Sequence, residues 1–267
     1  MILSRRIAFN DSWLDELDDA IVIRSIDPGT PKQNVQAVNR MGGAGQRMTV
    51  RHWEMIECSV TFAINIPRNQ LKARRQVFDA VVAWANNTGW LKINYMQDRR
   101  MHVDSVVIPS PGDLWNWTDE YTIVFRAYNV PFWQSTLVTK TISGTTVGGI
   151  AMEVPGNVES VLDATVTNKS GKTISYLSMT VKQGSKELSN LQLNDISLPA
   201  NGVVEISHGT NGILTIKKKS GNSSESIMNK LNASSSDDLF IRPGDISITF
   251  SAERAVTVDF SLRGRYL

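Results

Sequence analysis

Alternating apolar and polar positions predict β-strands over most of this chain. The clearest stretch runs from Val50 to Ile66, where Cys58, Val60 and Phe62 share one face of a strand because successive side chains point to opposite sides of a sheet. The alternation becomes irregular from Glu54 to Glu57, which predicts a bulge or a sharp bend at that point. Shorter alternating stretches predict further strands near residues 91–96, 101–108, 121–127, 174–181, 203–206, 213–216, 246–250 and 256–262. A four-residue polar turn, residues 97–100, predicts that the first two of these form a hairpin.

One amphipathic helix is predicted from Pro67 to about Asn87, because proline is tolerated in a first turn and Gly89 follows the last one. Its apolar positions, which include Trp84, fall on one arc of the helical wheel, so the helix is expected to cover a sheet. Arg74 projects from that apolar arc and must extend to solvent, meet a buried acid or point at another chain. Arg75 and Asp79 have the spacing of an ion pair on the opposite, solvated face.

The second half of the chain has the pattern of an antiparallel sandwich, with short strands separated by turns rich in Gly, Asn and Ser. Residues 135–157, rich in Ser, Thr and Gly, are interpreted as a junction with room for an edge strand. The polar stretch 220–238 predicts a long exposed loop with at most one helical turn. The expected fold class is mainly β: an α+β N-terminal domain with one main helix on a sheet or split barrel, residues 1–134, and a C-terminal β-sandwich, residues 135–267.

Tryptophan and arginine concentrate in the first half. All seven tryptophans lie at or before residue 133, and twelve of sixteen arginines precede residue 134, whereas nine of twelve lysines follow it. Both residue types are enriched at protein interfaces, because indole buries a large rigid surface and guanidinium presents a planar fork of donors. The first half is therefore interpreted as a region of protein contact, although each tryptophan could equally fill a core. The candidate subunit-interface residues are Arg51, Trp53, Arg74, Trp115 and Trp117.

Charge, cysteine content and hydropathy exclude several classes of function. Residues 1–133 hold fifteen basic and fourteen acidic side chains, and residues 134–267 hold thirteen and twelve. A duplex-binding module concentrates positive charge on one face, so nucleic acid is not inferred as a ligand. The single cysteine, Cys58, excludes an internal disulfide and suits maturation in a reducing cytosol. Neither a secretory signal nor a stretch of ~20 apolar residues is recognisable, so a soluble protein without a membrane partner is expected.

No residue pattern predicts an active site, a cofactor or a metal. His102 and Asp104 share a strand face at i,i+2, but a surface ladder pair explains that spacing, since no nucleophile elbow or zinc helix accompanies it. The acids Asp237, Asp238 and Asp245 lack the spacing of a calcium loop and suit turns.

A glycine-rich segment runs from Met41 to Arg47. It lacks the Gly-Lys-Ser/Thr sequence and the following helix of a phosphate loop. We interpret it either as an arm that reaches a neighbouring subunit or another protein, or as a surface loop without a role.

Several short features follow one another in a particular order along the chain. A bent strand carrying Arg51 and Ile64 precedes the helix with Trp84, a hairpin through Asp98-Arg99, the segments Ala127-Tyr128 and Phe132-Trp133, the Gly156-Asn157 turn, and Pro243-Gly244 before two strands. This order resembles the distal tail protein family of long-tailed bacteriophages with non-contractile tails. The resemblance spans nearly the whole chain, and its sharpest matches are the closure at residues 127–133 and the Pro243-Gly244 turn.

The resemblance implies a structural virion protein at the distal end of the tail. Residues 1–134 would form a homo-hexameric ring that continues the tail tube, and residues 135–267 would be a galectin-like sandwich facing outward. The implied partners are the tail tube protein, the tail-tip hub and receptor-binding or side-fibre proteins, with double-stranded DNA passing the lumen without specific binding. The protein would be assembled in the host cytoplasm. A closed ring of this kind requires a heterologous interface, in which one patch meets a different patch on the next copy.

The alternative function is a glycan-binding module, which a galectin-like sandwich also suggests. Sugar sites on such sandwiches stack the pyranose ring on an exposed aromatic platform. The second half contains no tryptophan, and its only tyrosines are Tyr176 and Tyr266. The composition therefore disfavours lectin activity.

Overall fold

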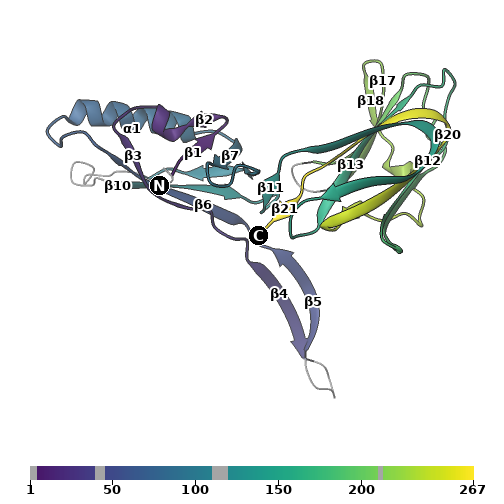
Figure 1. Ribbon diagram of the computed structural model, residues 1–267, viewed down its shortest axis with the longest axis horizontal. Coiled ribbons are helices and arrows are strands. Elements are labelled where there is room, and N and C mark those ends of the chain that lie inside the picture. Colours follow the sequence, from purple (N-terminus) through teal and green to yellow (C-terminus); the bar gives the residue numbers. More distant parts are fainter. Residues whose placement is uncertain (1–4, 40–45, 110–119, 210–212) are drawn as a thin grey trace. The chain divides into compact units, whose positions relative to one another are not determined.

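The computed structural model describes residues 5–39, 46–109, 120–209 and 213–267, with backbone only for 35–39 and 46–51. The chain forms two compact units: the first holds residues 1–133 and Leu267, and the second runs from Gln134 to Tyr266. The described residues contain one α-helix and many antiparallel strands (Figure 1), which confirms the predicted mainly-β class with a single helix. Each unit is described separately below.

The first unit contains short strands, one 3-10 turn and the helix. In chain order these are β1 (Ile7–Phe9), β2 (Ser12–Trp13), η1 (Leu14–Glu16), β3 (Ile21–Asp27), β4 (Gln33–Asn39), β5 (Gln46–Trp53), β6 (Ile56–Ile64), α1 (Leu71–Ala85), β7 (Gly89–Ile93), β8 (Arg99–Val103), β9 (Ser105–Val107) and β10 (Glu120–Ala127). One sheet has the order β2-β1-β7-β8, a second has the order β3-β6-β10-β9, and β4 pairs with β5. β11 (Trp133–Ser135) begins at the last residue of this unit before the chain enters the second.

Aromatic side chains link the two larger sheets and the helix of the first unit. The ring of Phe9 on β1 lies 5.3 Å from that of Phe125 on β10, and the ring of Phe78 on α1 lies 5.1 Å from that of Tyr121 on β10. Trp84 packs edge-on against both Phe9 and Phe125 at 5.9 and 5.8 Å. Because each buried aromatic ring contributes on the order of 1.5–3 kcal/mol, these contacts hold α1 over the strands. The prediction of a helix that covers a sheet is confirmed.

The helix begins later than predicted. Residues 67–70 form a turn, and α1 starts at Leu71 without a side-chain cap on its first turn. It ends at Ala85, where the predicted end lies near Asn87. Its inner face is the expected one, with Val77, Phe78 and Val81 buried. The predicted ion pair on the outer face is present, since Arg75 Nε lies 3.0 Å from an oxygen of Asp79.

The predicted strand from Val50 to Ile66 is two strands. The chain breaks at Glu54 and Met55, so that β5 pairs with β4 while β6 lies inside the four-stranded sheet. The irregular stretch in the sequence therefore marks a change of sheet and not a bulge. The predicted hairpin at residues 91–108 is confirmed for β7 and β8, but β9 leaves it and pairs with β10.

The second unit is built almost entirely from strands. These are β12 (Val138–Val154), β13 (Ser160–Asn168), β14 (Leu177–Gln183), β15 (Lys186–Leu193), β16 (Val203–His208), β17 (Leu214–Ser220), β18 (Ser223–Ser226), β19 (Phe240–Ile241), β20 (Gly244–Leu262) and β21 (Arg265–Tyr266), with a 3-10 turn η3 (Met228–Lys230). Their order is β15-β14-β20-β13-β16-β17-β18, with β12 also on β20 and β19 on β13.

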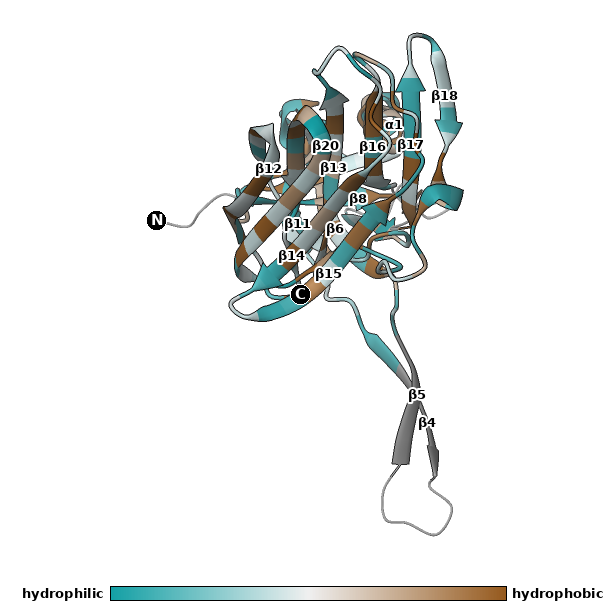
Figure 2. Ribbon diagram, turned by 90° about the vertical axis from the view of Figure 1, so that its right-hand side faces the viewer, coloured by the Kyte–Doolittle hydropathy of each residue, from teal (hydrophilic) through white to brown (hydrophobic). Residues whose placement is uncertain are grey.

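One curled sheet makes the sandwich, and β20 is the strand that joins its two layers. The first half of β20 pairs with β14, and the second half pairs with β13. β12 follows β20 along both halves, with register shifts between Gly144 and Ile150 that allow the ladder to bend. Every second residue of β13 and β14 points into one apolar core, and Figure 2 shows the resulting bands of hydrophobic and hydrophilic residues.

Three sequence predictions for the second unit need correction. The expected edge strand in the junction is present, because β12 pairs only with β20 among the described strands, but it spans 17 residues and takes up most of the predicted junction. The two strands predicted at 246–250 and 256–262 are one strand of 19 residues, whose inward positions keep their alternation through Ala252. The predicted loop at 220–238 contains β18 as well as the expected helical turn, η3.

The Gly156-Asn157 turn, one of the features behind the resemblance, has a steric basis. Gly156 has a φ of +112°, and a Cβ there would lie 2.3 Å from the carbonyl oxygen of Arg265. Only glycine tolerates both conditions. The close approach lets the amides of Asn157 and Val158 donate to that same carbonyl at 2.9 and 3.2 Å.

Candidate assembly surfaces

The four-stranded sheet of the first unit has two edges. In the order β3-β6-β10-β9, the strands β3 and β9 have no further neighbour among the described strands of that sheet. An edge strand presents a row of backbone N–H and C=O groups to another chain. On β9, the apolar side chain of Val107 is 42% exposed and lies opposite Val124 of β10. These edges are surfaces on which a further strand could pair.

The β4–β5 ribbon is a second candidate surface, and it carries two of the predicted interface residues. β4 and β5 pair only with each other among the described strands, and Figure 1 draws them apart from the two larger sheets of the unit. The backbone of Arg51 lies opposite Val35 in this ribbon. Trp53 is half-buried at its end, where its ring packs edge-on against Phe132 at 5.4 Å. Residues 41–45 of the glycine-rich segment lie outside the described residues.

The remaining tryptophans of the described residues divide into one core residue and several half-buried ones. Trp133 is 1% exposed, and its indole N–H donates to the carbonyl of Pro28 at 3.0 Å. Trp13 and Trp90 are half-buried beneath the guanidinium groups of Arg6 and Arg100, 4.5 and 5.1 Å from the ring centres. The predicted interface residues Trp115 and Trp117 lie outside the described residues. Indole and guanidinium thus already pair within one chain.

Arg74 does not reach the surface as an interface residue would. Its side chain is among the largest fully buried ones, with 1% exposure, and its Nη1 donates to the carbonyls of Ile66 at 2.8 Å and Ile64 at 3.4 Å. Of the three outcomes expected for this residue, the structure is nearest to a buried partner, and the partners among the described residues include two backbone carbonyls. We therefore do not retain Arg74 as a direct contact to another subunit.

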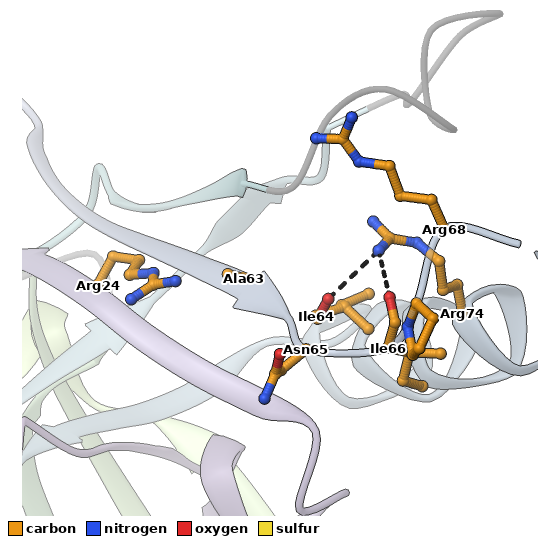
Figure 3. A pocket seen from close by; sticks show the side chains of 8 residues that line it. Arg24, Ala63, Ile64, Asn65, Ile66, Arg68 and Arg74 are labelled. Carbon is orange, nitrogen blue, oxygen red and sulfur yellow. Dashed lines mark hydrogen bonds between the residues drawn. The ribbon is translucent and has the colours of Figure 1, made fainter. Parts of the chain in front are cut away.

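A cavity beside Arg74 is lined by three arginines (Figure 3). Its volume is about 320 Å³, and its lining consists of Arg24, Arg68, Arg74 and residues 63–67. Arg24 comes from β3, Arg68 from the turn before the helix, and Arg74 from the first turn of α1. Nothing in the spacing of the sequence indicates that these three segments meet.

Asp104 anchors the turn that follows β10. Its carboxylate accepts hydrogen bonds from the backbone amides of Tyr128 and Asn129 at 2.7 and 2.9 Å and from the Asn129 side chain at 3.0 Å, and it lies 3.4 Å from Nδ1 of His102. Burial raises the pKa of Asp104, but the hydrogen bonds from Asn129 and Tyr128 and the proximity of His102 outweigh it, so this pKa lies below its ordinary value. The contact between His102 and Asp104 is therefore explained by the role of Asp104 in holding this turn.

A partly buried cluster of ionisable side chains lies in the second unit. The side chain of His208, fully buried at the end of β16, has Nδ1 2.9 Å from Asp163 Oδ1 and Nε2 3.5 Å from Asp238 Oδ1. The amide of His208 donates to the same oxygen of Asp163 at 2.9 Å. Arg265 lies near both acids; burial lowers its pKa, against the opposing influence of Asp163 and Asp238. The sequence offers no signal for this cluster, since Asp163 and His208 are 45 residues apart.

The outward face of β12 and β20 carries rows of hydroxyl groups. Thr141 donates to Asp259 at 2.5 Å, Ser143 pairs with Thr257 at 3.0 Å, and Thr146 pairs with Ser251 at 3.2 Å. Hydroxyl ladders of this kind stabilise a sheet across its strands and keep the exposed face polar. The exposed aromatic of this unit is Phe240, at 46%, on the short strand β19.

Other chemistry-bearing groups are few among the described residues. No group of three or more His, Cys, Asp or Glu side chains there has the arrangement of a metal site. The thiol of Cys58 is fully buried, and burial, with a smaller influence of Asp27, raises its pKa, so this cysteine is unreactive. The described chain also contains no candidate for a membrane-spanning helix.

Comparison with solved structures identifies similar folds. The chain aligns with the Dit (gp 19.1) protein of phage SPP1, described as a paradigm of the hub adsorption apparatus in phages that infect Gram-positive hosts, at 11% identity and a TM-score of 0.63, covering 97% of this chain and 98% of that one. Chains from the phage P2 baseplate in its activated conformation align at 8% identity and TM-scores of 0.47 and 0.45, which are too low to support an argument. No protein-family model and no curated protein matches. The fold is therefore the one that the resemblance to distal tail proteins predicts.

Proposed function

We propose that this protein is a structural component of a bacteriophage tail, a hub at the distal end of the tail tube. The observation that carries the proposal is the likeness to the SPP1 Dit fold, which extends over both units and nearly the full length of each chain. A likeness restricted to one sandwich would be weak, because sandwiches serve many functions. A matching order of a helix-covered first unit and a curled second unit is a more specific combination.

The finer form of the proposal is a homo-hexameric ring made by the first unit. Among the described strands, β3 and β9 are the two opposite edges of one sheet, so they could meet different patches on neighbouring copies. A heterologous contact between different patches is the kind that closes a ring. The β4–β5 ribbon provides a further arm for a neighbouring subunit or for the tube. Arg51, Trp53, Trp115 and Trp117 remain the proposed interface residues of this unit.

The proposed partners follow from the position of such a ring. The tail tube protein would bind on one side, and the tail-tip hub with receptor-binding or side-fibre proteins on the other, around the outward-facing second unit. Double-stranded DNA would pass through the lumen without sequence-specific binding, in keeping with a net charge of +2 over 267 residues. In this role the protein carries out no chemistry, and the virion tail tip is its location after assembly in the host cytoplasm.

Self-association of the full chain tests the proposal. We expect light scattering to give a mass near six times the 29.6 kDa protomer mass, and negative-stain images to show annular particles, at least when the cognate tube protein is present. A chain that stays monomeric at high concentration, in low and high salt and with the tube protein, would contradict the ring.

An edge variant tests how the ring closes. Lysine at an edge strand blocks pairing with another strand, so Val107→Lys is expected to reduce the fraction of assembled particles several-fold. Leu137→Lys is the matched control, because Leu137 is a similarly exposed apolar side chain, at 48%, in the second unit. Equal effects of the two substitutions would exclude the β9 edge as the specific contact.

A further inference from the structure

The second unit has one long strand edge that lacks a partner strand within the described chain. β12 pairs with β20 on one side, and its 17 residues form a border of the curled sheet (Figure 2). Outside the ladder with β20, residues 138–154 take part in none of the backbone hydrogen bonds of the described residues. An edge of this kind presents its N–H and C=O groups to another strand.

The other ends of the sheet are protected, which makes the edge of β12 an exception. On β15, the amide of Asn190 donates to the hydroxyl of Ser236 at 2.9 Å, and its carbonyl accepts from the amide of the same serine at 2.8 Å. Gln192 is held in the same way by the hydroxyl of Ser235 and the amide of Asn232, both at 2.9 Å. β18, at the opposite end of the strand order, is four residues long. Proteins commonly cover or shorten an edge to prevent unwanted pairing.

The composition of β12 favours an extended backbone. Nine of its 17 residues are Val, Ile or Thr, and only Lys140 and Glu153 are charged. Register shifts between Gly144 and Ile150 interrupt the ladder with β20, and such irregularities hinder pairing at that point. Before the shifts, residues 138–144 form an unbroken ladder of seven pairs with β20. This segment, the open edge, is long enough for an added strand of the usual length, about 5–6 residues.

One side of the open edge combines apolar surface with a positive charge. Val138 and Ile142 are partly buried and pack against the core of the unit. Lys140 lies between them on the same side, because side chains alternate along a strand, and it is exposed. Among the described lysines of this unit, Lys218 and Lys219 form ion pairs, whereas Lys140 forms none. An added strand would cover the two apolar side chains and would be favoured by an acidic side chain opposite Lys140.

The other side of the open edge presents hydroxyl groups. Thr139, Thr141 and Ser143 are exposed, and the last two belong to the hydroxyl rows shared with β20. Because hydroxyl pairs across strands stabilise a sheet, a strand that carries Thr or Ser on this side would continue the rows. The chemistry of the edge therefore selects a strand with an acidic residue between two apolar ones on one side and hydroxyl groups on the other.

We infer that the open edge is a docking site for an extended segment of another protein, which adds to the sheet as a further strand with these features. The choice of another protein over a second copy rests on the proposed function. Two copies joined through the same edge would form an isologous contact with two-fold symmetry, whereas the contacts that close a ring are heterologous. Among the described strands, the other long edge of this unit, β15, is covered by residues 232–236. A neighbouring copy in the ring therefore offers no suitable strand from its second unit.

Two peptides of matched sequence test the open edge. The first, Thr-Val-Thr-Glu-Thr-Val-Thr, places its glutamate opposite Lys140 and its valines beside Val138 and Ile142, and the second has lysine in place of the glutamate. Each carries a terminal fluorophore and is titrated with the full chain at low salt. Fluorescence anisotropy is expected to show saturable binding of the glutamate peptide, about fivefold tighter than that of the lysine peptide.

Charge reversal on the protein provides the matched variants. Lys140→Glu is expected to reverse the preference, so that the lysine peptide binds more tightly. Lys182→Glu is the control, because Lys182 is an exposed lysine of the same unit on β14, which has a partner strand on each side. It should leave the preference unchanged. Hydrogen exchange then locates the bound peptide, and the amides of residues 138–144 are expected to exchange more slowly.

The inference is overturned if neither peptide binds saturably, if Lys140→Glu leaves the preference unchanged, or if the slowed exchange lies on β3 or β9 instead. It is also overturned, in favour of a second copy, if the glutamate peptide converts wild-type dimers to monomers in sedimentation. A monomeric chain that binds the glutamate peptide at the open edge would contradict the proposed ring and leave the docking site standing. A ring that binds neither peptide would do the reverse.

Discussion

The two units reach a packed core by different means. The first contains all seven tryptophans and builds its core from two small sheets and a helix, joined through contacts such as Phe9 with Phe125. The second contains no tryptophan, and a single curled sheet encloses a core of mostly aliphatic side chains. Regular alternation is sufficient for one sheet to bury one face. Several small elements meeting at irregular angles need large rigid side chains to fill the space between them.

This comparison changes the interpretation of the tryptophan cluster. A concentration of indole and arginine indicates an interface only where the side chains are accessible. In the first unit Trp133 is buried, Trp84 packs on two phenylalanines, and Trp13 and Trp90 lie beneath arginines of the same chain. Part of the compositional signal therefore reports the construction of this unit and not its partners.

The largest loss of stability is expected when a core tryptophan, rather than a surface tryptophan, is removed. Trp133→Ala removes a fully buried ring and leaves the carbonyl of Pro28 without its donor, so we expect a loss of about 3–5 kcal/mol in the free energy of unfolding. Trp90→Ala is the control and is expected to cost less than about 1 kcal/mol, because that ring is half-exposed and its cation–π contact is worth little in water. Denaturation followed by tryptophan fluorescence reports on the first unit alone. Similar losses for the two variants would contradict this division.

A smaller loss of stability is expected when the buried Arg74 of the first unit is replaced. Arg74→Met keeps most of the side-chain volume but leaves the carbonyls of Ile64 and Ile66 without their donor, which costs about 2–3 kcal/mol. Arg75→Met removes an exposed ion pair and should change stability by less than about 0.5 kcal/mol. Urea denaturation of the two variants measures the difference. Equal free energies of unfolding for Arg74→Met and Arg75→Met would show that the buried guanidinium of Arg74 does not stabilise the first unit.

The sequence predicts the second unit's strands better than the first unit's, for a physical reason. Where one face of a long strand is buried, as in β13 and β14, alternation in the sequence follows burial residue by residue. In the first unit the pattern predicts neither β3 nor β4. It predicts a bulge or a sharp bend at the break after Trp53, because a change of sheet leaves the alternation on either side intact. For β12 the pattern predicts an edge strand but not its length, because the Ser, Thr and Gly residues of this strand are exposed along much of it.

The candidate sites were predictable only where their residues are close in the sequence. His102 and Asp104 form the expected pair, and Arg75 with Asp79 does so on the helix. The arginine-lined cavity and the cluster around His208 join segments separated by tens of residues. No local periodicity brings such segments together, since sheet topology decides which strands are neighbours.

In the second unit, replacing the buried His208 is the experiment that corresponds to replacing Arg74 in the first. His208→Ala removes the side-chain contacts to Asp163 and Asp238 and leaves two carboxylates beside the half-buried Arg265, so we expect a loss of about 2 kcal/mol. His208→Gln, which keeps a donor and an acceptor, should recover part of it. Because this unit lacks tryptophan, circular dichroism is the measurement. Fluorescence should stay unchanged, and a shift in fluorescence equal to that in circular dichroism would show that the effect is not confined to the second unit.

The smallest effects are expected at two carboxylates whose pKa is lowered, one in each unit. Asp104 is partly buried and accepts three hydrogen bonds, so Asp104→Asn should cost about 1–2 kcal/mol near pH 7. Since the folded-state pKa lies below the unfolded value, this stability is present above about pH 4 and is lost as the pH falls through the folded pKa. The difference between wild type and variant should therefore shrink in acid.

Glu253 is the counterpart in the second unit, and its exposure makes the comparison informative. The amide and hydroxyl of Ser175 donate to it at 2.9 and 2.8 Å and lower its pKa. Water competes for a fully exposed carboxylate, so Glu253→Gln should follow the same acid dependence with a much smaller amplitude than Asp104→Asn. Acid denaturation of both variants between about pH 2 and 7 provides the test. An equal loss of stability for the two variants would mean that burial does not strengthen the hydrogen bonds of Asp104. The two carboxylates would then stabilise their units equally.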